Sequence, residues 1–392
     1  MRARWCVAWV AMAVMATATA CSSGGSAGTA AMTSMSSPLA ANTATTPAPA
    51  SATGQTAEGS SGVAAPSGKV WIDTEKGSAL VPGLPEMTSL LRLSSSGAGV
   101  LGLGADGQVW AIMMNRPTGT AAVSKVGLSG IRKISVSGET GDPTWYAVGT
   151  DGKVTQGWGD TEGNGTAPLV TGSLSLPFSD VVDVATERGP WLLRSDGTVW
   201  LVSIPEDGHS GTSTAGPGGP SPQGAQAIPV QGLTGVTHLW SGVGQDRPIA
   251  ETKDGKLVEL DRQSPQAPTA TAIQGPEAPV AQLVAMNDTW VALDSQHHLW
   301  FWEAGADDNH QSLAGRTPKQ LVGPTAPDPL VTDGESLYAA DNSVWGLAKD
   351  SDTDTITVKS LAGPPTDPTM ARQHLLAVVR AGAGSSLAIV QG

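Results

Sequence analysis

The chain has 392 residues and a net charge of −13, and only 15% of its residues are charged, against about a quarter in an average soluble domain. Its 49 glycines and 28 prolines far exceed the usual combined share of roughly 12%. The acidic balance argues against a nucleic-acid partner and a polybasic membrane patch, because both need a basic surface. The glycine and proline content favours turn-rich β-structure.

The N-terminus has the pattern of an export signal. Arg2 and Arg4 precede an uncharged stretch over residues 5–20, which is shorter than the roughly 20 residues that a spanning helix needs. Small residues then lead to Cys21, and Ala18-Thr19-Ala20-Cys21 resembles a bacterial lipobox. This predicts a signal peptide over 1–20 and a lipid on Cys21, with localisation at the outer face of the bacterial cell membrane. The alternative is a plain secretory signal cut near Ala20.

The other cysteine, Cys6, lies inside the signal, so the mature chain has no cysteine pair and needs no disulfide. Residues 21–66 are mostly Ala, Ser, Thr, Gly and Pro, and Glu58 is their only acidic residue. Such a segment cannot offset its ordering entropy. We expect a disordered tether that spans about 35–40 Å as a random coil.

One pattern recurs over residues 67–392: an apolar stretch, a turn that is often Asp-Gly, and a strand that usually carries Val-Trp. The clearest copies are Asp106-Gly107-Gln108-Val109-Trp110 and Asp196-Gly197-Thr198-Val199-Trp200. The position of the Trp, here called the Trp slot, is filled by Trp71, Trp110, Thr155, Trp200, Val258, Trp300 and Trp345.

The Asp-Gly pairs predict type I′ turns between paired strands, and Val and Trp suit a half-buried strand. A repeat of about 45 residues indicates one small sheet per copy, and such sheets must stack to bury their faces. Seven copies predict a seven-bladed, all-β propeller. Residues 386–392 lack a following turn and strand, and residues 67–71 lack a preceding strand. The two ends should therefore pair in one shared blade and close the ring.

The repeat resembles the RCC1-like seven-bladed propeller family over about 67–392. The carriers are the Asp-Gly-x-Val-Trp units, Gly157-Trp158-Gly159-Asp160, Trp300-Phe301-Trp302 and a lead-in such as Gly232-Leu233-Thr234-Gly235-Val236. The resemblance implies a rigid propeller that binds partners through a face of loops. Some secreted bacterial members inhibit β-lactamases, so it also implies a possible inhibitor-like role.

Two residues break a column of small side chains that we expect along the innermost strands. The column is Ser94, Ser135, Ala185, Trp240, Ala285, Thr332 and Arg380. Trp and Arg are common binding hot spots, so Trp240 and Arg380 are candidate binding residues at one mouth of the channel. The alternatives are a structural plug or an alignment that slips by one residue.

Trp145 and Trp290 precede the turn by six residues. Side chains alternate between the two faces of a strand, and this position falls on the face opposite to that of the expected core residues. They are further candidates for partner contact, with packing between blades as the alternative. The tryptophans of the Trp slot should be core residues. The long Gly- and Pro-rich segment 206–229 is either a tolerated insertion or a binding loop.

No catalytic constellation, cofactor motif or metal-ligand spacing is found. His297-His298 occupies a turn, and Asp307-Asp308-Asn309-His310 lacks the length of a calcium loop. The sequence therefore predicts a surface lipoprotein whose propeller binds an extracellular protein or another envelope component, without a cofactor. The alternatives are a lyase or hydrolase that acts on envelope glycans or a small molecule, and an envelope scaffold with several weak partners.

The anchor can be tested directly. The substitution Cys21→Ala removes the candidate lipidation residue and should release the protein into the soluble fraction. The reason is that several acyl chains anchor a protein to a membrane much more firmly than a single acyl chain does. Membrane fractionation with immunoblotting measures this, and Cys6→Ala is the control. Unchanged membrane retention of the Cys21→Ala protein would rule out the lipobox interpretation.

Overall fold

In the computed structural model, the described residues are 66–74, 77–93, 99–115, 120–137, 144–159, 169–186, 189–204, 224–241, 247–264, 267–286, 289–302, 312–321, 330–332, 336–339, 344–349, 356–361, 374–380 and 386–391. The chain divides into two units, Met1–Ser61 and Gly62–Gly392. The expected signal peptide, the lipidation residue Cys21, the tether up to residue 65 and residues 206–223 of the Gly- and Pro-rich segment lie outside the described residues. The end of that segment is not a loop but a strand, Gln226–Pro229. Among the described residues, no helix is long and apolar enough to cross a membrane.

The described part of the second unit is built from strands. The first half contains β1 (Lys69–Thr74), β2 (Gly77–Leu80), β3 (Met87–Arg92), β4 (Gly99–Gly104), β5 (Val109–Asn115), β6 (Thr120–Lys125), β7 (Ile131–Ser137), β8 (Thr144–Gly149), β9 (Val154–Trp158), β10 (Leu169–Ser173), β11 (Val181–Thr186), β12 (Pro190–Arg194), β13 (Val199–Ser203) and β14 (Gln226–Pro229). The second half contains β15 (Val236–Trp240), β16 (Ile249–Thr252), β17 (Leu257–Ser264), β18 (Ala267–Ile273), β19 (Val280–Met286), β20 (Thr289–Asp294), β21 (Leu299–Phe301), β22 (Lys319–Gln320), β23 (Leu330–Thr332), β24 (Ser336–Ala339), β25 (Val344–Lys349), β26 (Ile356–Leu361), β27 (His374–Arg380) and β28 (Ser386–Gln391).

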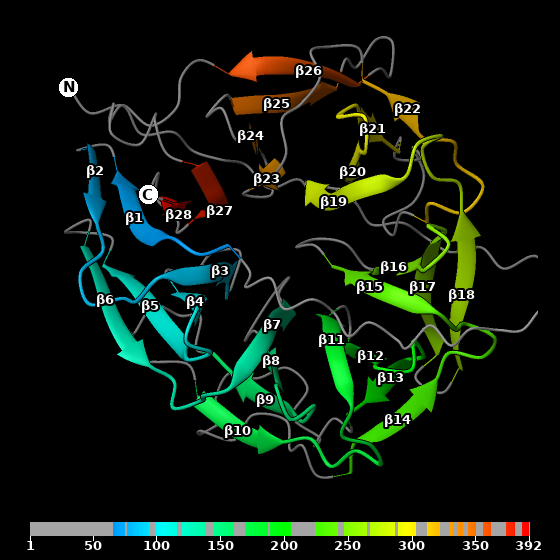
Figure 1. Cartoon of the computed structure of the whole chain (residues 1–392), viewed down its shortest axis with the longest axis horizontal. Coiled ribbons are helices and arrows are strands. Elements are labelled where there is room, and N and C mark those ends of the chain that lie inside the picture. Colours follow the sequence, from blue (N-terminus) through cyan, green and yellow to red (C-terminus); the bar gives the residue numbers. More distant parts are fainter. Residues whose placement is uncertain are drawn as a thin grey trace, which may run out of the picture. The chain divides into compact units, whose positions relative to one another are not determined.

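Among the described residues, these strands pair into four-stranded antiparallel sheets. Six sheets each use four consecutive strands: β3–β6, β7–β10, β11–β14, β15–β18, β19–β22 and β23–β26. A further, composite sheet has the order β2-β1-β28-β27 and joins the two ends of the second unit. The sheets lie around a centre, with β3, β7, β11, β15, β19, β23 and β27 innermost (Figure 1). The β-propeller that the sequence predicts is confirmed.

The Trp slot lies on the third strand of each sheet, counted from the centre. Its tryptophans pair across the ladder with small residues in three cases: Trp71 with Ala388, Trp110 with Gly102, and Trp300 with Ala292. A small neighbour leaves room for the indole on the face of the sheet, which is how cross-strand pairs specify one another. Trp71, Trp110 and Trp300 are half-buried at the margins of the core.

The Asp-Gly turns differ from the expected type I′. Only the glycines take positive φ, 72° at Gly107, 74° at Gly152, 79° at Gly197 and 73° at Gly255, whereas a type I′ turn needs positive φ at both central residues. The N–H of Gly107 donates to the carbonyl of Gly104 at 2.9 Å. This is a type I turn followed by a left-handed glycine, the three-residue hairpin loop with a G1 bulge. The preceding Asp accepts the N–H two residues on, as in Gln108 to Asp106 at 3.1 Å.

The turn glycine also connects one sheet to the next. The carbonyl of Gly107 accepts the N–H of Ile131, the first residue of β7, at 2.9 Å. The same bond joins Gly152 to Val181 and Gly197 to Val236 at the start of β11 and β15. These three turns therefore position the innermost strand of the following sheet.

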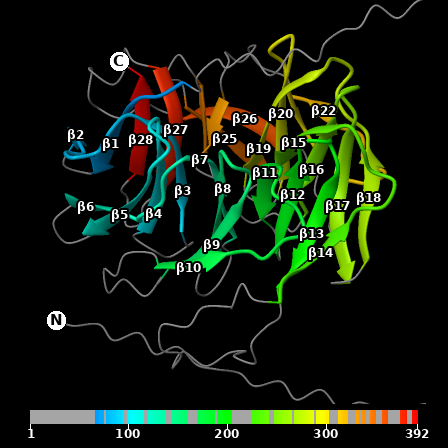
Figure 2. The same cartoon turned by 60° about the horizontal axis from the view of Figure 1, so that its bottom comes forward.

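Seven clusters of buried apolar side chains lie between neighbouring sheets in the described part of the chain. One cluster combines Leu101 and Val109 of the β3–β6 sheet with Ile134 and Trp145 of the β7–β10 sheet. Equivalent clusters fill the other contacts between adjacent sheets, including both sides of the composite sheet. Because each sheet has its two faces covered by different neighbours, no sheet is an independent folding unit. Figure 2 shows the sheets stacked edge-on around the centre.

In the composite sheet, hydrogen bonds alone join β28 to β1, whereas the equivalent second and third strands of the other sheets are also joined by a short connection of the chain. Trp71 of β1 pairs with Ala388 of β28, and the carbonyl of Gly68 accepts the N–H of Met87 at 2.8 Å. Gly68 thus bonds to β3 as Gly107 bonds to β7. A Cβ at Gly68 would lie 2.4 Å from the Val390 carbonyl oxygen, so only glycine fits where the two ends meet.

This pairing predicts how the chain responds to cutting and rejoining. Deleting residues 383–392 removes β28 and should lower the free energy of unfolding by roughly 5 kcal/mol or more, because Leu387, Ile389 and Val390 are buried and each apolar side chain contributes about 1.5–3 kcal/mol. Thermal denaturation followed by circular dichroism measures the loss. A deletion variant that melts like the full chain would show that β28 does not hold the ends together.

A circular permutant provides the matched control. Joining Gly392 directly to Gly68 recreates the length of the loop from Gly104 to Gly107, and new termini within residues 205–223 leave every described strand intact. We expect this permutant to melt within a few degrees of the parent. Its failure to fold would contradict the equivalence of the composite sheet to the others.

Candidate functional site

Trp240 ends β15, the innermost strand of its sheet. Its indole is half-buried and packs against a cluster that contains Leu283 and Trp290 of the next sheet. The exposed imidazole of His238 stacks on it, with ring centroids 5.5 Å apart and ring planes 18° apart. The pair forms a partly exposed aromatic surface, in which Trp240 also serves as packing between two sheets.

The register corrects the column in which Trp240 and Arg380 were grouped. A β-bulge interrupts the innermost strand near its start in β3, β7, β11, β15, β19 and β27. Residues that pair at the level of Trp240 are Leu91, Ser135, Ala185, Val284 and Val379. Arg380 and Ala285 lie one residue further along and Thr332 lies one residue short, so the alignment slipped by one in β19, β23 and β27. Ser94 lies outside the described residues. Arg380 still ends an innermost strand, paired with Ser386.

Trp145 and Trp290 are core residues, which corrects their candidate role in partner contact. Their side chains are 0% and 2% exposed and lie in the clusters between sheets. The chain makes room for Trp145 by leaving out a side chain: a Cβ at Gly157 would lie 1.8 Å from the indole of Trp145. The prediction from side-chain alternation was wrong here because both faces of these strands are buried.

The contact between the β15–β18 and β19–β22 sheets, here called the Trp240 junction, differs from those before it. A Cβ built on Gly152 or Gly197 would meet the next sheet at 2.1 or 3.0 Å, whereas one on Gly255 would meet nothing within 4 Å. Among the described residues, no backbone bond links Gly255 to Val280. The turn therefore does not set this junction, and large aromatic side chains fill it.

A buried carboxylate holds the Trp240 junction instead. Glu259 on β17 is 2% exposed and accepts hydrogen bonds from the guanidinium of Arg247 at 2.8 Å and the hydroxyl of Ser312 at 2.7 Å. It also accepts the N–H of Leu313. Across the same junction, the indole N–H of Trp302 donates to the carbonyl of Gln274 at 3.0 Å. Sequence reasoning missed Glu259, whose one signal is a carboxylate between the apolar residues Val258 and Leu260.

The turn at His297-His298 is structural. His297 takes the place of the turn glycine and is the only non-glycine residue with positive φ in the described part of the chain, at 63°. Asp294, 1% exposed, supports the turn by accepting the N–H groups of Gln296 at 2.8 Å and His298 at 2.9 Å and the indole N–H of Trp300 at 2.8 Å. Burial raises the pKa of Asp294, but these hydrogen bonds outweigh it, so the net pKa is lowered.

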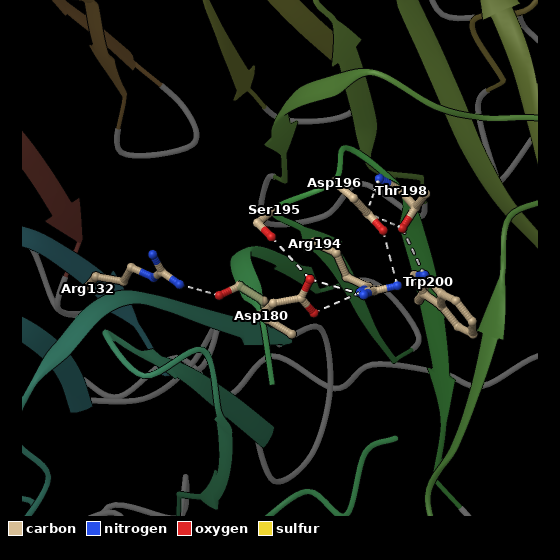
Figure 3. A network of polar contacts seen from close by, with 8 residues as sticks. Arg132, Asp180, Arg194, Ser195, Asp196, Thr198 and Trp200 are labelled. Atoms are coloured by element: carbon tan, nitrogen blue, oxygen red, sulfur yellow. Dashed lines mark hydrogen bonds and ion pairs between the residues drawn. The ribbon is translucent and has the colours of Figure 1, made fainter. Parts of the chain in front are cut away.

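A polar network surrounds the turn between β12 and β13 (Figure 3). Arg194 donates two hydrogen bonds to Asp180, at 2.8 and 3.0 Å, and these hold the pKa of Asp180 below its usual range. The same guanidinium lies 4.9 Å from the Phe178 ring centroid and 5.9 Å from that of Trp200. With every carboxylate paired within its own sheet, this network stabilises the turn and offers no acid–base pair for catalysis.

Within the described residues, no group of three or more His, Cys, Asp or Glu side chains could hold a metal ion. The candidate cation loop, residues 307–310, lies outside them.

Comparison with known proteins identifies the fold. No protein-family model and no curated protein matches the chain. Two solved structures of the yeast protein RCC1 (Prp20) are similar in fold, each with a TM-score of 0.51 and 13% identity. Both matches cover 83% of this chain. The first structure is that of Kap60 bound to yeast RCC1 (Prp20), and the match covers 89% of its Prp20 chain. The second is that of Prp20p from Saccharomyces cerevisiae, reported with its binding properties to Gsp1p and histones, and the match covers 92% of its chain. A structure of human WBSCR16 has a TM-score of 0.48 at 11% identity, with 83% of this chain and 99% of that chain covered. The chain thus has a β-propeller fold similar to that of RCC1.

The Asp294 network predicts a pH-dependent contribution to stability. A carboxyl with a lowered pKa stabilises the fold fully above its unfolded value of 3.8, and this contribution is lost as the pH falls through the lower folded value. Asp294→Asn should cost about 1–3 kcal/mol near neutral pH, and the difference from the parent should shrink below pH 3.8. Urea denaturation across pH measures this. The exposed turn variant Asp106→Asn is the control, and an equal cost in both variants would contradict the role of Asp294.

Proposed function

We propose that the chain is an exported lipoprotein whose RCC1-like, seven-bladed propeller binds a protein or another envelope component through the face at the end of β15. The ring closed by β1 on β28 supplies a rigid platform, and the export pattern at Arg2, Arg4 and Cys21 supplies the setting. Fold alone does not determine function, so the proposal depends on the site.

The observation that carries the proposal is the partly exposed stack of Trp240 and His238. Trp145 and Trp290 are buried in the core, whereas Trp240 retains exposed indole surface beside an exposed ring. Tryptophans that are fixed by packing on one side and open on the other lose little conformational freedom on binding, which is why they are enriched among interface hot spots.

The topology adds a second line of support. The longest connection between strands leaves from the end of β13 at Ser203 and returns to the start of β14 at Gln226. Because the sheets repeat one topology, Ser203 and Gln226 lie at the end of the β11–β14 sheet that corresponds to the end of the β15–β18 sheet where β15 finishes at Trp240. Loops that extend from a rigid scaffold commonly carry binding residues.

Site-specific photo-crosslinking tests this function. A photo-reactive residue replaces Ser241, which is exposed next to Trp240, and in a matched protein it replaces Lys256, which is exposed at the opposite end of the same sheet. With cell envelope of the source organism, Ser241 should form one major adduct that is absent at Lys256.

The variant Trp240→Ala, with melting measured in parallel, should remove the Ser241 adduct. Replacing the exposed His238 by Ala should weaken it without lowering the melting temperature. Equal adducts at Ser241 and Lys256, or no adduct at either, would overturn the proposal that this face binds a partner.

A further inference from the structure

The innermost strands surround the centre of the ring (Figure 1), but neighbouring ones do not approach each other equally. β3 lies close to β7, β7 to β11, β11 to β15, β19 to β23, β23 to β27 and β27 to β3. β15 and β19, the innermost strands at the Trp240 junction, come less close together. Among the described strands, this is therefore the junction with the least contact at the centre.

The side chain that follows the bulge links an innermost strand to the next sheet in β7, β11 and β19. The ammonium of Lys133 lies 3.2 Å from Oδ1 of Asp183 on β11. Asp183 follows the bulge of β11 and accepts the N–H of Leu239 on β15 at 3.2 Å. Gln282 follows the bulge of β19 and accepts the N–H of Leu330 on β23 at 2.8 Å. This position of the innermost strand thus serves as an inter-sheet link.

His238 holds this position in β15 and makes no such link. It is the first paired residue after the bulge of β15, opposite Glu251. Its ring is exposed and stacks on Trp240, two residues further along the same strand. Among the described residues, no hydrogen bond or ion pair joins β15 to β19. The junction therefore lacks both the bond of the turn glycine and the link of the innermost strand.

The same two sheets are firmly joined further from the centre. Glu259 on β17 accepts the hydroxyl of Ser312, from the connection between β21 and β22, at 2.7 Å. The backbone carbonyl of Gln274 accepts the indole N–H of Trp302 at 3.0 Å, and its Oε1 accepts the hydroxyl of Thr317 at 3.0 Å. These contacts, here called the outer bonds, hold the sheets together on the side away from the centre.

The inner side of the junction is filled by side chains without directional bonds. Trp240 and Val280 lie half-buried at the margin of the apolar cluster. The indole Nε1 of Trp240 is buried and has no hydrogen-bond partner. A buried donor without an acceptor costs free energy, and this cost is recovered when water reaches the donor. Separation of the inner strands is thus partly offset by hydration of the indole N–H.

We propose that the Trp240 junction is a hinge of the ring. β15 and β19 separate and close at the centre, while the outer bonds at Glu259 and Gln274 keep the two sheets attached. Packed elements move in this way when their directional bonds are confined to one side of the contact. Because Trp240 and His238 lie on β15, each opening changes the aromatic surface that they present. Regulation of partner binding by the hinge rests on the function proposed above, but the hinge itself does not.

Hydrogen–deuterium exchange with mass spectrometry on the full mature chain tests the hinge without a partner. Local opening determines how fast paired strand amides exchange. The amides of β15 and β19 should exchange about tenfold faster than those of β7 and β11, the factor expected for one missing hydrogen bond. The amides of β17 should remain as protected as those of β13, because the outer bonds hold that strand.

Two results would overturn the proposal. Equal exchange in β7, β11, β15 and β19 would show that the wider junction is as rigid as the others. Exchange in β17 as fast as in β15 would show that the whole sheet detaches and that the outer bonds are no pivot. Neither result bears on whether the Trp240 surface binds a partner, which the photo-crosslinking experiment measures separately.

A reciprocal exchange of side chains tests the cause of the opening. His238→Gln gives β15 the side chain with which β19 binds its neighbour, and should slow exchange in β15 and β19 about tenfold. Gln282→His is the matched reverse change and should speed exchange in β23 while β7 and β11 keep parental rates. Because His238 is exposed, its variant should fold even if Gln282→His does not. Fast exchange that persists in His238→Gln would contradict a junction that can close.

Discussion

The structure depends on one repeated hydrogen bond, from the first N–H of an innermost strand to the carbonyl of the preceding sheet's turn glycine. It occurs at Gly68, Gly107, Gly152 and Gly197. Gly107, Gly152 and Gly197 take positive φ, and Gly68 does not. The absence of a Cβ allows the close approach, since a Cβ at Gly152 would lie 2.1 Å from the Ser179 carbonyl oxygen and one at Gly68 would lie 2.4 Å from that of Val390. At these four places the bond sets where the following sheet begins, and apolar clusters cover both faces of that sheet.

Among the described residues, the same bond is absent at two successive junctions, and side chains replace it there. Glu259 holds the Trp240 junction through Ser312 and Leu313, and Gln282 binds the backbone of Leu330 at the following one. The cluster of the Trp240 junction contains four tryptophans, and the partly exposed Trp240 is one of them.

Charge is also partitioned by the architecture. The Asp-Gly turns place Asp106, Asp151, Asp196 and Asp254 at one end of their sheets, where they accept nearby N–H or side-chain donors. Hydrogen bonds from Lys256 and Thr252 lower the pKa of Asp254 to about 2. The acidic character of the chain therefore lies partly in its turns.

The sequence by itself determined the β-propeller class and the place of the Trp slot on the third strand, because turn chemistry and alternation act over a few residues. The all-β fold and the hairpins could be predicted from Asp-Gly units such as Asp106-Gly107. Only the tertiary structure decided which tryptophans are exposed, because strands buried on both faces carry no parity signal, as Trp145 and Trp290 show. It also decided the inner column, since the pairing register places Val379, and not Arg380, at the level of Trp240. Finally, it brought Glu259 to Leu313, which lie 54 residues apart, and Lys133 to Asp183, because such contacts depend on how neighbouring sheets stack rather than on any local pattern.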